Sequence, residues 1–124
     1  MDRPPAPDMK PDEVIGFPGS PGIAQGTVKV VHEVSDAGKL NPDDILLTEY
    51  TLPSWSPLFA RTAALVTDSD GVLSHSAVVA REYGIPAVVG TGTATAVIRD
   101  GQVIEVDGTA GRVRMVSQND NMQL

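Results

Sequence analysis

The stretch that most constrains the fold is residues 67–92, TDSDGVLSHSAVVAREYGIPAVVGTG, which combines a turn, a helix start, a helix stop and a buried segment. Residues 69–71 are a turn signal, and Ser74 is a good helix N-cap. Gly84, followed by isoleucine and proline, is typical of a helix end. We therefore predict a helix from about His75 to Tyr83, with a buried strand before the turn and another after the helix.

This spacing places His75 in the first turn of the predicted helix. The N–H groups of a first turn have no partner within the helix, and together with the positive end of the helix dipole they favour an anion. The same field disfavours an imidazolium cation, and nucleophilic attack on phosphorus requires a neutral ring. We therefore predict that His75 carries a phosphoryl group. An ordinary helix start is the alternative interpretation of these residue types.

Four neighbours of His75 are candidates for holding that group. The hydroxyls of Ser74 and Ser76 are hydrogen-bond donors suited to phosphoryl oxygens. The backbone N–H groups of Ser76 and Ala77 are further donors, because both residues lie in the first turn. Gly71 would let backbone approach where a side chain would obstruct it.

Four other residues receive structural roles. Arg81 lies on a different helical face from His75, so we expect it to form a salt bridge with a carboxylate. His32 follows a predicted strand without a helix start or a glycine turn, which indicates a surface or capping residue. Trp55, bracketed by two prolines, is expected to pack in the core, and Pro57 begins a predicted short helix that runs to about residue 61.

The remaining apolar segments predict a compact mixed domain of the α+β class. β-Branched and apolar runs between turn residues indicate strands. The predicted strands are residues 23–31, 45–48, 63–67, 87–89, 103–106 and 112–115, the last two forming a hairpin.

Composition excludes several classes of protein. The net charge of -7 argues against a nucleic-acid or anionic-membrane surface, since both need clustered lysine and arginine. The absence of cysteine excludes disulfides, thiol nucleophiles and cysteine-bound metals. With no signal-peptide pattern and no long apolar run, we expect a soluble, cytoplasmic chain.

The chain of 124 residues is expected to form one domain. Residues 1–14 are rich in proline and charge, which predicts a flexible tail or linker. Residues 15–116 form the predicted domain, and residues 117–124 a frayed tail. A domain of this size is too small to hold a nucleotide site, a metal site and an acceptor pocket as well, which favours a module that serves partners.

The run GVLSHSAVVAREYGIPAVVGTGTAT, at residues 71–95, resembles the phosphohistidine swivelling domain of phosphoenolpyruvate-utilising enzymes. Three more segments resemble that domain in the same order, namely residues 16–26, 52–59 and 100–109. The segment around Trp55 is most similar to the phosphoenolpyruvate synthase and rifampicin phosphotransferase branches. The chain departs from the family at Asp70, where a glycine is usual.

The resemblance implies a layered β/β/α swivelling domain in which His75 is the phospho-accepting residue and Ser74 the hydroxyl residue before it. It implies an ATP-grasp partner, domain or subunit, that binds ATP and Mg²⁺ and places a phosphoryl or pyrophosphoryl group on His75. A second partner would present the acceptor, for example pyruvate. The domain itself is then expected to hold no cofactor and no metal.

Two other functions remain open at this point. One is an enzyme I-like phosphocarrier of a sugar phosphotransferase system, charged by phosphoenolpyruvate. The other is a catalytically silent interaction or regulatory module of the same fold, for which Asp70 is the suggestive feature.

Overall fold

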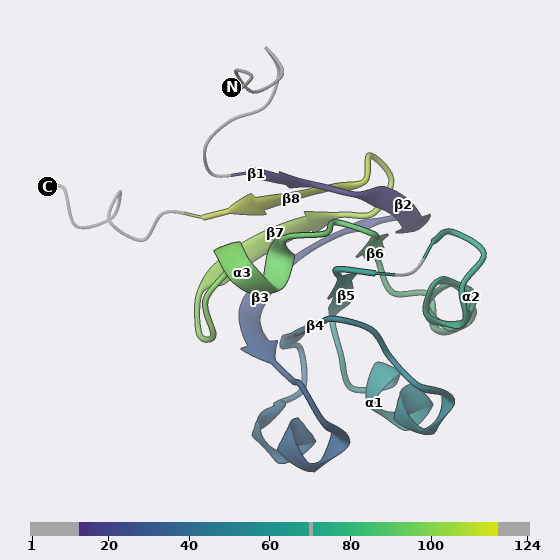
Figure 1. Ribbon diagram of the computed structural model, residues 1–124, viewed down its shortest axis with the longest axis vertical. Helices are drawn as coiled ribbons and strands as arrows, with labels where there is room; N and C mark the ends of the chain where they lie inside the picture. Colours follow the sequence, from purple (N-terminus) through teal and green to yellow (C-terminus); the bar gives the residue numbers. More distant parts are fainter. Residues whose placement is uncertain (1–12, 70, 117–124) are drawn as a thin grey trace, which may run out of the picture.

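The computed structural model describes residues 13–69 and 71–116. Within them the strands are β1 (Glu13–Ile15), β2 (Phe17–Ser20), β3 (Ile23–Val30), β4 (Ile45–Thr48), β5 (Ala64–Thr67), β6 (Ala87–Val89), β7 (Val103–Asp107) and β8 (Arg112–Met115). The helices are α1 (Ser56–Phe59), α2 (His75–Tyr83) and α3 (Ala94–Val97), with 3-10 helices η1 (Val34–Lys39) and η2 (Pro53–Trp55). In Figure 1, α1 and α2 lie on the opposite side of the strands from α3.

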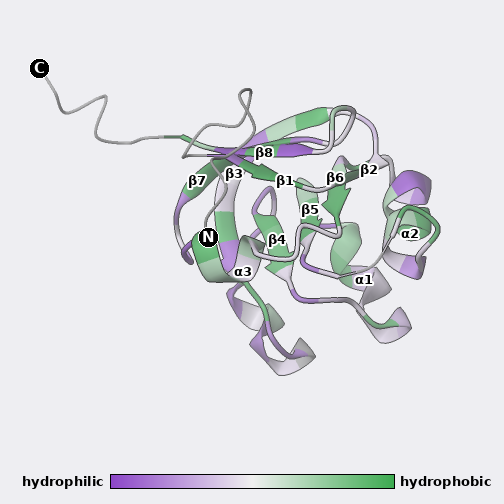
Figure 2. Cartoon of the chain, turned by 45° about the horizontal axis from the view of Figure 1, so that its top comes forward, coloured by the Kyte–Doolittle hydropathy of each residue, from purple (hydrophilic) through white to green (hydrophobic). Residues whose placement is uncertain are grey.

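The centre of the sheet is parallel and buried. β3, β4, β5 and β6 pair in parallel, and every residue of β4, β5 and β6 is buried. Successive side chains of a strand point to opposite faces, so a strand buried throughout must be covered on both. This explains why these strands read as uninterrupted apolar runs, and Figure 2 shows the hydrophobic colour on β4 and β6 in the middle of the molecule.

The two faces of the parallel strands pack into different hydrophobic clusters. One cluster joins them to β1, β7, β8 and α3, and its buried members are Val14, Val28, Ile45, Leu47, Ala64, Val66, Val88, Ala94, Ile98, Ile104, Val106, Val113 and Met115. The other joins them to α1 and α2, and its members are Val31, Leu40, Leu46, Trp55, Phe59, Leu65, Val79, Ala80 and Ala87. The layers are therefore strand, strand and helix, which confirms the expected β/β/α arrangement.

The sheet also closes on itself. Its strand order is β1-β8-β7-β3-β4-β5-β6-β2, so its two end strands are consecutive in the chain and separated by Gly16 alone. The N–H of Gly16 donates to the carbonyl of Gly111 at 2.9 Å. A Cβ at Gly16 would lie 2.6 Å from the carbonyl oxygen of Val89. Only glycine fits at this junction, because the backbone of β6 passes too close for any side chain.

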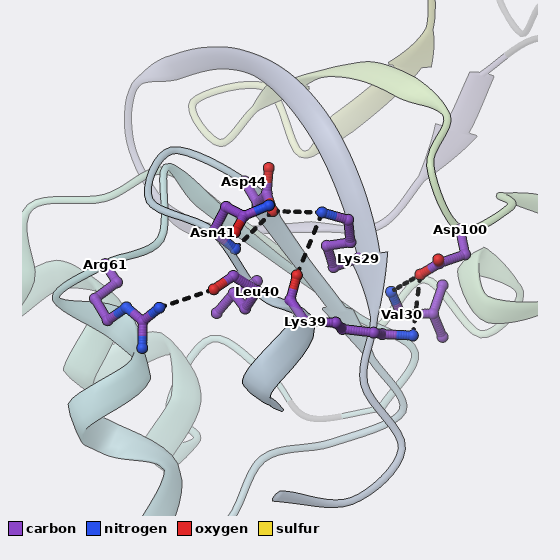
Figure 3. Close-up of polar contacts among 8 residues, drawn as sticks. All are labelled: Lys29, Val30, Lys39, Leu40, Asn41, Asp44, Arg61 and Asp100. Atoms are coloured by element: carbon purple, nitrogen blue, oxygen red, sulfur yellow. Dashed lines mark hydrogen bonds and ion pairs between the residues drawn. The ribbon is translucent and has the colours of Figure 1, made fainter. Parts of the chain in front are cut away.

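A network of polar contacts holds η1 and its flanking turns against the sheet (Figure 3). The ammonium of Lys29 donates to the Asp44 carboxylate at 2.8 Å and to the Lys39 carbonyl at 3.3 Å. The ammonium of Lys39 lies 3.2 Å from the Asp100 carboxylate. The N–H of Val30 donates to that carboxylate at 2.7 Å and, with the Lys39 ammonium, lowers the pKa of Asp100.

Most predicted elements lie where the sequence placed them. β4, β6, β8 and α2 coincide with the predicted residues, and β3, β5 and β7 do so within one residue. The predicted short helix at Pro57 is α1, which begins one residue earlier and ends at Phe59. The side chain of Trp55 is 3% exposed, which confirms its place in the core.

The sequence did not indicate β2, α3 or η1. β2 is rich in glycine and proline, and it forms because it pairs with β6. The predicted tail, residues 1–14, is corrected at its end, because Glu13 and Val14 belong to β1 and Val14 is 3% exposed. The rest of that tail and the predicted C-terminal tail lie outside the described residues. Within the described part of the chain, no helix is long and apolar enough to cross a membrane.

Candidate functional site

The imidazole of His75 is exposed at the first residue of α2. Ser74 is the N-cap of this helix, with extended backbone angles (φ -71°, ψ 164°), and its Oγ accepts the N–H of Ala77 at 3.3 Å. Gly84 ends the helix in the left-handed conformation at φ 72°. Strong local signals at both ends therefore set the first turn, and with it the position of His75, as the sequence predicted.

Ser56 makes a polar side-chain contact with His75 and was not among the predicted site residues. Its Oγ lies 3.3 Å from Nε2 of the imidazole and donates to the carbonyl of Pro53 at 2.9 Å. Ser56 is the first residue of α1 and is 19 positions from His75 in sequence. The available signal was the position of the serine between Trp55 and Pro57, in a segment that resembles the family.

The hydroxyl of Ser76 faces the interior, which corrects its predicted contact with a phosphoryl oxygen. Ser76 is 1% exposed, and its Oγ lies 2.5 Å from Oγ1 of Thr51, which is 8% exposed. The reason is helix geometry, since adjacent helical residues lie on different faces. With His75 turned to solvent, the next side chain turns to the interior, where it meets Thr51. The predicted role of the Ser76 backbone N–H stays a prediction.

The N–H of Ala77 is also engaged, because it donates to Oγ of the capping Ser74. The prediction that this N–H faces a bound anion stays a prediction, because the cap contact does not test it. Ser74 accepts that bond through a lone pair, so its hydroxyl proton can still donate to a phosphoryl oxygen. Gly71 is exposed, and a Cβ built on it meets no atom within 4 Å, so the loop before the helix is open there.

Arg81, a residue of α2, contacts the loop that precedes this helix. Its Nη1 donates to the carbonyl of Gly19 in β2 at 2.5 Å and to the carbonyl of Val72 at 3.1 Å. Among the described residues its partners are thus backbone carbonyls instead of the expected carboxylate. Asp70, whose charge the sequence analysis singled out, lies outside the described residues.

The loop that leads to α2 begins at the carboxyl end of the parallel strand β5. The Asp68 carboxylate accepts the N–H of Thr95 at 3.0 Å and the hydroxyl of Thr91 at 3.2 Å, which ties β5 to the first turn of α3. The N–H and the hydroxyl of Ser69 both donate to the carbonyl of Glu49, each at 2.9 Å. These contacts join the ends of β4 and β5 where the segment that leads to α2 begins.

His32 lies at the surface, as expected. Its Nδ1 is 3.8 Å from the Glu49 carboxylate, and both side chains are more than half exposed. Among the described residues, no group of three or more histidine, aspartate or glutamate side chains is placed to hold a metal ion.

Residues 40–111, more than half of the chain, match the family described as PEP-utilising enzyme, mobile domain. The chain belongs to this family. Its exposed His75, set at the start of a capped helix, is thus found in a phosphohistidine mobile domain of the phosphotransferase type. The strand and helix layers described above are the fold of that domain.

Similar proteins include enzymes much longer than this chain. Chondramide synthase cmdD of Chondromyces crocatus is 52% identical over 112 residues, covering 90% of this chain and 3% of that protein. Rifampicin phosphotransferase of Streptomyces sviceus is 48% identical over 110 residues, covering 89% of this chain and 13% of that protein. Phosphoenolpyruvate synthase of Aeropyrum pernix is 47% identical over 115 residues, covering 90% of this chain and 14% of that protein.

Among solved structures, the solution structure of Enzyme I (nEIt) superposes with a TM-score of 0.57 at 29% identity. The match covers 68% of this chain and 35% of that one. This chain is therefore similar to one part of a larger protein in each of these comparisons.

Proposed function

We propose that this domain accepts a phosphoryl or pyrophosphoryl group on His75 from an ATP-grasp partner and passes it to a small-molecule acceptor such as pyruvate. The observation that carries the proposal is the exposed imidazole at the capped N-terminus of α2. A donor from another domain can reach this ring, and the first helical turn favours the anion that is delivered. Relatives named phosphoenolpyruvate synthase and rifampicin phosphotransferase support the same reaction class.

Both transfers proceed by displacement at phosphorus. A lone pair of an imidazole nitrogen forms the N–P bond, while the P–O bond to the nucleotide breaks and its electron pair leaves with the nucleotide oxygen. In the second transfer an acceptor oxygen attacks the same phosphorus, and the N–P electron pair returns to the ring. Such transfers depend mainly on positioning and on stabilisation of the phosphoryl charge. We assign Mg²⁺ and ATP binding to the partner, and we expect the reaction in the cytoplasm, where ATP is available.

A labelling experiment tests this proposal. The 124-residue chain is incubated with Mg²⁺, an ATP-grasp domain of a phosphoenolpyruvate synthase and ATP labelled separately at the β and γ phosphates. We expect an acid-labile, base-stable label on the wild type and on His32→Ala, and none on His75→Ala. His32→Ala is the matched control, because the chain has two histidines and both are exposed. An unlabelled wild type, or label that persists in His75→Ala, contradicts the proposal.

The likeness to Enzyme I favours one alternative, a carrier charged by phosphoenolpyruvate. The discriminating measurement uses labelled phosphoenolpyruvate in place of ATP, together with the phosphoenolpyruvate-binding part of an enzyme I. Label on His75 from phosphoenolpyruvate but not from ATP identifies this alternative. A folded protein that neither ATP nor phosphoenolpyruvate labels indicates the catalytically silent interaction or regulatory module.

A further inference from the structure

Two contacts tie the stretch around His75 to one short segment that follows β4. At the start of this stretch, the N–H and the hydroxyl of Ser69 both donate to the carbonyl of Glu49, each at 2.9 Å. At its end, Oγ of Ser76 lies 2.5 Å from Oγ1 of Thr51. Glu49 and Thr51 are two residues apart, so their Cα atoms are separated by at most about 7 Å. One short segment therefore holds both ends of the stretch that carries the histidine.

Of the two contacts, the one between Thr51 and Ser76 is the stronger constraint. Both of these side chains are buried, whereas Glu49 and Ser69 are exposed. Water substitutes for a lost partner at the surface, but a buried hydroxyl that loses a partner is left with its desolvation cost. Thr51 is itself anchored, because Trp55, four residues on, is buried in the cluster that includes residues of α2.

The contact reaches His75 through the first turn of α2. Ser76 follows His75 directly, and the N–H groups of the next two residues, Ala77 and Val78, donate to the side chain and the carbonyl of Ser74 at 3.3 and 3.0 Å. A hydrogen-bonded helical turn moves as a unit, so holding the side chain of Ser76 fixes how this turn is rotated about the helix axis. That rotation sets the direction in which His75 leaves the helix.

We propose that Thr51 is a positioning residue that acts through Ser76 to orient His75 for phosphoryl transfer. This role deepens the proposed function and rests on it. Transfer requires the attacking nitrogen in line with phosphorus, and a displacement of about 1 Å costs up to about 10²-fold in rate. Thr51 is buried, so its effect on the reaction passes through the first turn of α2 and not through contact with the phosphoryl group.

The kinetics of loading test this role. Thr51→Val keeps the shape of the side chain and removes its hydroxyl. In the labelling assay with the ATP-grasp domain, we expect kcat to fall about two- to tenfold, the rate equivalent of one neutral hydrogen bond. The KM for the ATP-grasp domain should stay at the wild-type value, because the exposed surface is unchanged. Thr51→Ser, which keeps the hydroxyl, should restore kcat.

Two further variants separate positioning from loss of stability. Ser76→Ala should slow loading as Thr51→Val does, and combining the two should slow it no further, because both remove the same contact. Thr62→Val is the matched control, since Thr62 is a buried threonine beyond α1 whose hydroxyl donates to the carbonyl of Leu58 at 2.7 Å. It should be destabilised in urea unfolding and still load at the wild-type rate.

Amide hydrogen exchange gives a readout without a partner. In Thr51→Val we expect the N–H groups of Ala77 and Val78 to exchange about two- to tenfold faster than in the wild type, and to be unchanged in Thr62→Val. A wild-type kcat in Thr51→Val, equal slowing in Thr62→Val, or unchanged exchange overturns the positioning role. A wild type that takes no label contradicts the proposed function instead, and the exchange measurement still tests Thr51, so the two failures are distinguishable.

Discussion

At the scale of single residues, the site depends on a division of roles within one helical turn. Ser74 caps the helix, His75 faces solvent and Ser76 faces the interior. The residue types alone made both serines equivalent candidates for contact with a phosphoryl group. They differ because each step along a helix rotates the side chain to another face. The sequence therefore predicted the nucleophile and its cap, while the direction of the second hydroxyl needed the packed structure.

Replacing the capping serine tests its double role. Ser74→Ala should lower the free energy of unfolding by about 0.5 to 2 kcal/mol, because the N–H of Ala77 loses its acceptor. It should also slow loading of His75, because a donor to the phosphoryl oxygens is lost. Urea unfolding and the labelling assay measure the two effects. If Ser74→Ala is destabilised but loads at the wild-type rate, Ser74 is a cap alone.

At the scale of elements, contacts near both ends of α2 hold the helix in place. Arg81 joins it to β2 and to the loop before His75, while Thr51 and Ser76 join it to the segment of α1. These partners are distant in sequence, so helix periodicity did not reveal them. Periodicity placed Arg81 away from His75, but it did not show that the guanidinium reaches back to the loop that leads into the helix.

Removing the guanidinium tests this brace. Arg81→Gln should free the loop at Val72 and destabilise the protein by about 1 kcal/mol, since its two backbone acceptors lose their donor. We expect faster amide hydrogen exchange at residues 72–74 than in the wild type. Glu82→Gln is the matched control, because it alters an exposed neighbour on the same helix. Equal exchange in Arg81→Gln and Glu82→Gln would show that Arg81 does not hold the loop.

At the scale of the whole molecule, one stretch of chain joins the two ends of the sheet. One extended segment pairs with β8 through β1 and with β6 through β2, so both ends of the sheet are bound to one stretch of chain. Because of this pairing, β8 and β6 each have a partner strand on both edges, so neither presents an open edge for pairing with other chains. The pairing also places the parallel strands so that their carboxyl ends carry the loop of His75.

A substitution at the junction tests closure. Gly16→Ala should lower the free energy of unfolding by about 1 to 3 kcal/mol, because its Cβ would lie 2.6 Å from the Val89 carbonyl oxygen. Gly38→Ala is the matched control, since a Cβ there meets no atom within 4 Å. Chemical denaturation of both variants measures the difference. Equal stability of the two variants would show that β6 can move away from Gly16 at little cost.

The sequence alone determined the elements whose signals are local. The cap and stop of α2, the apolar runs of β4 and β6 and the turn between β7 and β8 depend on residues within a few positions of each other, and these elements lie where they were predicted. The motif around His75 likewise lies within one continuous stretch. Backbone preference and short-range hydrogen bonds are sufficient for such features.

Tertiary structure alone decided the strand order, the pairing of β2, the inward direction of Ser76 and the contact of Ser56 with His75. Each of these features depends on residues that lie far apart in the sequence. Each forms only when other elements pack against the buried faces of the sheet. Their physical cause is the packing of two apolar layers around a closed sheet, which no local stretch of sequence specifies.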